Sequence, residues 1–193
     1  MSSNLFSFES LSKSHFPSKI ILDTNFILNL THEYTHHPTS KNVIECSNFL
    51  KSLIWDESEI FIPQIVINEF CHQVFLNVLS EYMHNHNLKI NRVDLYKAKP
   101  YLIAPGHHQV KEVLKMLDKI ISKTILKEMD MAVQNTAIKI MEKYNLFPSD
   151  AFIGAIAIEN NIRHIATLDV YFAKNIVKEG VSVYLPEILL PRK

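Results

Sequence analysis

Short apolar runs alternate with longer segments of helical periodicity along most of this chain. Four runs are rich in β-branched residues and end at or near a carboxylate or a proline, which predicts strands at 19–22, 59–62, 162–167 and 181–185. In other segments apolar residues recur every three or four positions, which predicts helices, the clearest at 64–79, 110–129 and 150–159. The alternation predicts an α/β fold with three layers, in which helices cover both faces of a mainly parallel sheet.

One domain is expected from a length of 193 residues with 47% hydrophobic residues. We expect residues 1–18 to form an N-terminal tail and residues 19–193 to form the domain. Residues 82–130 are interpreted as a helical, locally basic insertion, with an irregular first part because its prolines and polar residues interrupt any periodicity. Cys46 and Cys71 lack a CxxC spacing, so we interpret them as buried free thiols.

Charge is unevenly distributed, although the formal net charge is zero. Between Lys89 and Lys127 the chain has nine Lys or Arg and three Asp or Glu, so this stretch carries +6 and the remainder carries −6. Within it, lysines recur every four residues along the predicted helix, at Lys111, Lys115, Lys119, Lys123 and Lys127. They are either contacts for the phosphates of a nucleic acid or the solvated face of an ordinary helix.

Membrane and secretory segments are not expected. No run approaches the roughly 18 apolar residues that a membrane-spanning helix needs, and the start of the chain lacks a basic region followed by an apolar block. We therefore predict a cytoplasmic protein that has no membrane partner. Its histidine pairs, such as His36-His37 and His107-His108, do not have the HExxH spacing of a zinc site and are interpreted as surface residues.

Four acidic residues follow predicted strands or begin predicted helices. Asp23 and Asp169 come just after strands, Asp150 begins a helix, and Glu69 lies early in the helix after the second strand. The carboxyl ends of parallel strands meet at one edge of a sheet, so these side chains are candidates for a single site. Crowded carboxylates repel one another unless a cation neutralises them, and oxygen ligands without His or Cys favour Mg²⁺ or Mn²⁺. Each acid alone is equally well explained as a helix cap.

The segments around these acids resemble, in order, the motifs of the PIN-domain nuclease family, which has VapC-like toxin ribonucleases among its members. They are Ile21–Leu28 (ILDTNFIL), Ile67–Phe70 (INEF), Asp150–Ala157 (DAFIGAIA) and Ala166–Phe172 (ATLDVYF). The resemblance spans about residues 19 to 185. Its one departure is the long segment of about eighty residues between the second and third acids.

The resemblance implies a PIN-like fold and a divalent-metal-dependent endoribonuclease. Asp23, Glu69, Asp150 and Asp169 would be the catalytic, metal-binding acids, oriented by Asn25 and Thr167. Mg²⁺ or Mn²⁺ would be the cofactor, and the expected partners are RNA in single-stranded or loop regions, an antitoxin protein if the chain is the toxin of such a pair, and a second copy of the chain. Lys111, Lys115, Lys119 and Lys123 are the candidate RNA contacts. Two alternatives stay open: a non-catalytic module that binds RNA or protein, and a structure-specific DNA nuclease.

Overall fold

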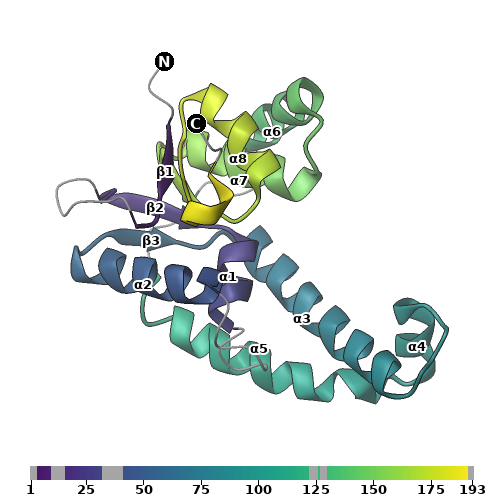
Figure 1. The fold of residues 1–193 in the computed structure, drawn as a ribbon. Coiled ribbons are helices and arrows are strands. Elements are labelled where there is room, and N and C mark those ends of the chain that lie inside the picture. Colours follow the sequence, from purple (N-terminus) through teal and green to yellow (C-terminus); the bar gives the residue numbers. More distant parts are fainter. Residues whose placement is uncertain (1–3, 10–15, 32–40, 122–125, 127–129, 191–193) are drawn as a thin grey trace. The chain divides into compact units, whose positions relative to one another are not determined.

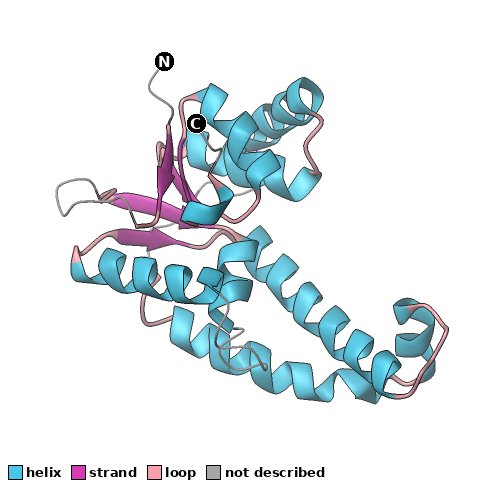
Figure 2. Cartoon of the chain, viewed as in Figure 1, coloured by secondary structure: helices cyan, strands magenta, loops and turns pink. Residues whose placement is uncertain are grey.

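A five-stranded, wholly parallel sheet lies at the centre of the fold (Figures 1 and 2). The structure is a computed structural model and describes residues 4–9, 16–31, 41–121, 126 and 130–190. The strand order is β1-β5-β4-β2-β3. The strands are β1 (Leu5–Ser7), β2 (Lys19–Leu22), β3 (Glu59–Phe61), β4 (His164–Ala166) and β5 (Ser182–Leu185). The predicted α/β class and its parallel sheet are confirmed.

The outermost strand β1 lies in the segment that the sequence predicted to be a tail. Leu5 pairs with Val183 in a parallel register with β5, so the prediction of a tail over residues 1–18 was wrong for this part. Phe6 stacks on Tyr184 with ring centroids 5.4 Å apart, and Phe8 stacks on Phe49 at 4.5 Å. Burial of aromatic side chains therefore holds this segment on the sheet, although three strand residues are too few to show a periodic pattern.

Helices cover both faces of the sheet (Figure 1). The first layer contains α1 (Thr24–Thr31) and α2 (Lys41–Trp55), and the second contains α6 (Met131–Tyr144), α7 (Pro148–Glu159) and α8 (Val170–Ile176). Phe49 of α2 packs on Phe26 of α1 and on Tyr184 of β5, so the first layer is joined to the sheet by an aromatic cluster. Short 3-10 helices, η3 (Val177–Glu179) and η4 (Glu187–Leu189), flank β5.

The chain divides into two compact units, one of residues 1–67 and 121–193 and the other of residues Asn68–Ile120. The first contains the sheet and the helices named above. The second contains most of α3 (Gln64–Asn85), together with α4 (Arg92–Ala98), the 3-10 helix η2 (Pro100–Ile103) and α5 (Ala104–Leu117). Within it α3 and α5 approach closely at Gly106, where an added Cβ would lie 2.8 Å from the Phe75 ring.

The segment from 82 to 106 is helical rather than irregular, which corrects the sequence interpretation. Helix α3 continues to Asn85, and the Asn91 side chain caps α4 by accepting a hydrogen bond from the Asp94 amide at 2.8 Å. Pro100 and Pro105 lie in the first turns of η2 and α5. Proline is compatible with a first turn because the amide there has no partner within the helix, so these prolines mark helix starts.

The lysine repeat extends over less helix than predicted. Helix α5 ends at Leu117 instead of continuing to residue 129, and Lys119 lies in the turn that follows. Beyond that turn Ile121 bridges Ile60 in the parallel sense, which requires extended backbone. Lys111 and Lys115 lie on α5, where Lys115 pairs with Glu112 at 2.9 Å. Lys123 and Lys127 lie outside the described residues.

Both cysteines are free, as predicted. Cys46 is completely buried on α2, and burial raises the pKa of its thiol to about 12. Cys71 on α3 is only partly buried, and desolvation raises its pKa as well. Neither thiol is therefore activated as a nucleophile.

None of the helices in the described part of the chain combines the length and apolar content needed to cross a membrane.

Candidate active site at the sheet edge

Asp23 lies at the junction between β2 and α1. Its amide donates to the Ala166 carbonyl at 3.0 Å, which continues the pairing of β2 with β4, and its own carbonyl accepts from the Ile27 amide at 3.2 Å as α1 begins. The side chain is 2% exposed. Its Oδ1 accepts from the Thr24 amide at 2.6 Å, so a buried carboxylate is held in one orientation by the backbone of its own turn.

Thr167 connects Asp23 to Asp169. Thr167 is fully buried just after β4, and its amide donates to the Tyr184 carbonyl at 3.1 Å. Its hydroxyl donates to Asp23 Oδ2 at 2.6 Å and accepts from the Asp169 amide at 2.9 Å. Thr167, which is expected to orient the acids, therefore forms a direct hydrogen bond with one of them, Asp23. The Thr167 hydroxyl therefore fixes the chain just after β4 relative to Asp23 at the end of β2.

Asp169 and Asp150 each lie in the first turn of a helix. Asp169 is the N-cap residue of α8, where its Oδ1 accepts from the Phe172 amide at 2.8 Å. Asp150 lies in the first turn of α7 and, like Asp169, is partly exposed. Helix α7 begins at Pro148, with Phe147 at the N-cap position. The helix-cap interpretation holds for Asp169, which is nevertheless partly exposed, just after the carboxyl end of β4.

The remaining candidates lie on α3 and α1. Glu69 is in the second turn of α3, partly exposed, at the start of the Asn68–Ile120 unit. Asn25 is exposed in the first turn of α1, and its carbonyl accepts from the Asn29 side chain at 2.8 Å. The orienting role expected of Asn25 stays a prediction.

The acids of the site offer hard oxygen donors of the kind that a divalent cation such as Mg²⁺ prefers. Within the described residues, no three or more His, Cys, Asp or Glu side chains form a group that could hold a metal ion. Mg²⁺, however, keeps several waters and is usually bound through one or two carboxylates plus substrate phosphates. Asp23 and Asp169 carry hard oxygen donors, and the Thr167 hydroxyl links the Asp23 carboxylate to the backbone amide of Asp169. The residues present therefore fit Mg²⁺ or Mn²⁺ better than a cation that requires His or Cys.

Two exposed aromatic residues beside the aspartates were not singled out by the sequence. Phe147 precedes α7 and is 79% exposed, and Tyr171 in the first turn of α8 is 57% exposed. Neither belongs to a periodic pattern. The available signal was proximity, because Phe147 is three residues before Asp150 and Tyr171 is two residues after Asp169.

Comparison with known families identifies one domain. The family model of the PIN domain matches residues 20–176, which is most of the chain and includes β4, all but the first residue of β2, and all four acids. No curated protein matches the chain.

Proposed function

Because the chain belongs to the PIN-domain family, whose domains are generally nucleases, we propose that it is a divalent-metal-dependent endoribonuclease. The observation that carries the proposal is the Thr167 hydroxyl, which joins Asp23 and Asp169 at the carboxyl edge of the sheet. Open α/β sheets bind their ligands at this edge. Asp150 in the first turn of α7 is a third acid of the motif set, and Glu69 on α3 is the fourth.

Each aspartate has a distinct part in the proposed reaction. Asp23 is buried and fixed by two short hydrogen bonds, so it provides a stationary negative charge. Asp169 and Asp150 are partly exposed, so they face the incoming phosphate and water. The chemistry supplied by a divalent cation is acidification of water and neutralisation of phosphate charge. Thr167 keeps Asp23 and Asp169 in register, which is the usual task of a residue behind metal-binding carboxylates.

The proposed substrate is RNA, in single-stranded or loop regions. Lys111, Lys115 and Lys119, all in the Asn68–Ile120 unit, remain candidates for phosphate contact by the charge argument made from the sequence. We propose the toxin of a toxin–antitoxin pair as the biological setting, with an antitoxin protein or a second copy of the chain as partner. A neighbouring gene for a small DNA-binding protein would support this setting.

The test uses the substitution Asp169→Asn. Asparagine caps a helix about as well as aspartate, so α8 should stay intact, whereas the charge offered to the cation is lost. We expect wild-type protein to cut transfer, ribosomal or unstructured RNA with Mg²⁺ or Mn²⁺ but not with chelator. Asp169→Asn should cut at least about a hundredfold more slowly with an unchanged melting temperature.

The matched control is Asp56→Asn, which removes an exposed carboxylate from the turn between α2 and β3 and should leave cleavage unchanged. Single-stranded and branched DNA belong in the same panel. RNA binding without cleavage would favour the non-catalytic alternative, and cleavage of branched DNA alone would favour the DNA nuclease. If Asp169→Asn and Asp56→Asn lose activity equally, Asp169 has no specific role in cleavage.

A further inference from the structure

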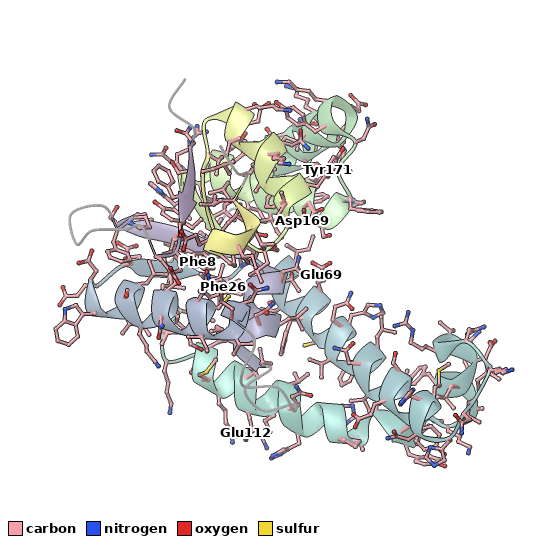
Figure 3. All side chains as sticks on the ribbon, in the orientation of Figure 1. Phe8, Phe26, Glu69, Glu112, Asp169 and Tyr171 are labelled. Atoms are coloured by element: carbon pink, nitrogen blue, oxygen red, sulfur yellow. The ribbon has the colours of Figure 1, made fainter. Side chains whose placement is uncertain are left out.

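Two exposed aromatic side chains share helix starts with the motif aspartates. Phe147 is the N-cap residue of α7, and Asp150 lies one turn further along that helix. Tyr171 is the second residue of α8, two residues after the cap formed by Asp169. Figure 3 shows Tyr171 and Asp169 together at the start of α8. Each of these two aspartates therefore has an exposed aromatic residue within three positions of it at the same helix start.

A hydrogen bond joins the first turn of α8 to the end of α6, just before the connection that carries Phe147. The Tyr171 hydroxyl donates to the Tyr144 carbonyl at 2.9 Å. Tyr144 is the last residue of α6, and Asn145 turns the chain there with a left-handed φ of 52°. Because Phe147 follows two residues after this turn, the bond ties the first turn of α8 to the connection that carries Phe147. The bond also restrains the Tyr171 ring while 57% of the residue stays exposed.

Position, more than exposure, distinguishes this pair from other surface aromatics. Trp55 is even more exposed, at 83%, and single exposed apolar residues are normal in proteins. Trp55, however, ends α2 just before β3 begins. In a parallel sheet the strands start at one edge and end at the other, so Trp55 lies at the edge opposite the aspartates. Phe147 and Tyr171 lie at the edge where the proposed cleavage takes place.

We propose that Phe147 and Tyr171 stack on unpaired nucleobases beside the phosphate that is cut, so that the site accepts single strands with little preference for base. This inference rests on the proposed nuclease function and deepens it. Every nucleobase has an aromatic face, so stacking tolerates sequence, and its loss on removal of an aromatic residue weakens binding by roughly tenfold per base. The bases of a duplex are stacked on one another and do not offer these faces.

The first measurement compares steady-state cleavage of a single-stranded oligoribonucleotide by wild type, Phe147→Leu and Phe147→Tyr. Leucine keeps an apolar side chain but removes the ring, whereas tyrosine keeps the ring. We expect KM to rise roughly tenfold for Phe147→Leu while kcat and melting temperature are maintained, and Phe147→Tyr to resemble wild type. For the second ring, Tyr171→Phe should keep binding and Tyr171→Leu should lose it. Trp55→Leu is the control and should change nothing.

The second measurement tests contact with a base directly. A series of substrates carries one abasic nucleotide each, at successive positions around the cleaved phosphate. With wild type, kcat/KM should fall about tenfold when the abasic nucleotide is at one of these positions. With Phe147→Leu, the same abasic substrate should be cut as efficiently as the intact one, because the ring that would stack on the missing base is already absent. In chelator, wild type and Phe147→Tyr should quench the fluorescence of a 2-aminopurine oligoribonucleotide, whereas Phe147→Leu should not. Cleavage by wild type without abasic sensitivity or quenching would overturn stacking and leave the nuclease standing. If the wild type neither cleaves nor binds RNA, the proposed function is overturned, and the stacking proposal with it.

Discussion

At the scale of single residues, the Thr167 hydroxyl is the contact on which the proposed site depends. It donates to Asp23 and accepts from the amide of Asp169, and the residue is fully buried. Thr167→Val keeps the branched shape and removes only the hydroxyl. We expect a folded variant that needs ten- to a hundredfold more Mn²⁺ for half-maximal cleavage, because loss of a residue that orients metal ligands has costs of this size. The variant should also show a smaller rise in melting temperature on addition of Mn²⁺.

Thr136→Val is the matched control for this substitution. The Thr136 hydroxyl donates to Glu159 at 2.7 Å, which is likewise a hydroxyl–carboxylate hydrogen bond. Glu159 is the last residue of α7, at the opposite end of that helix from Asp150. Both variants should lose stability, by about 1–3 kcal/mol, because each leaves a polar group without its partner. Only Thr167→Val should shift the metal titration, and a shift of equal size in both would assign Thr167 a purely structural role.

At the scale of residues, the sequence predicts which side chains belong to the site but not the contacts that they make. The family resemblance implies that Thr167 orients the acids, but it assigns no partner to the hydroxyl. That Thr167 bonds to Asp23 depends on the pairing of β4 with β2, and strand order is not encoded in any local pattern. The exposed position of Phe147 was equally hidden, because it follows from the turn at Asn145 and the way α6 and α7 pack.

At the scale of elements, Gly154 allows α7 to lie close to α8. An added Cβ would be 2.5 Å from Ile176 Cδ1 and 3.3 Å from Ile176 Cγ1. Gly154→Ala should therefore lower the free energy of unfolding by about 1 kcal/mol, as overpacking exceeds the gain in helix propensity. Ile176→Val removes the δ-methyl group and should cost about 1 kcal/mol by itself. The double variant should be less destabilised than the sum by about 1 kcal/mol, measured by urea unfolding.

Gly180 offers the matched control for this pair. It has a left-handed φ of 77°, and an added Cβ would meet nothing within 4 Å. Gly180→Ala should cost about 1 kcal/mol through backbone strain alone, and Ile176→Val should not relieve that cost. Strictly additive effects for Gly154→Ala and Ile176→Val would mean that α7 tolerates the extra methyl group by moving.

Element prediction succeeded where the signal was local and failed where tertiary packing decided. The strands near β2, β3, β4 and β5 were found because each is a buried, β-branched run. Strand β1 was missed because its three residues are held by aromatic contacts with segments far along the chain. The 3-10 helix η2 and the start of α5 were missed because the prolines in their first turns interrupt the apolar periodicity.

At the scale of the whole molecule, acid stability depends on groups whose protonation differs between the folded and unfolded chain. The Lys143 ammonium and the Tyr144 hydroxyl donate to Glu179 at 2.7 and 2.6 Å and hold the pKa of that carboxyl below its usual value. Burial lowers the pKa of His164 in the folded chain. Both groups bind protons more readily when unfolded, so both make the folded state less stable as pH falls.

Glu179→Gln should isolate the carboxylate part of this dependence. Near pH 7 we expect the variant to be about 1 kcal/mol less stable than wild type, a modest value because Lys143 is 61% exposed. A lowered folded pKa gives stability that is complete above the unfolded value of about 4.3 and disappears as pH falls through the folded pKa. The two urea-unfolding curves should therefore converge below about pH 4. As a control, Lys143→Gln should destabilise the wild type but should have no further effect in the Glu179→Gln variant. A difference in stability between wild type and Glu179→Gln that stays constant down to pH 3 would show that the carboxylate charge does not cause it.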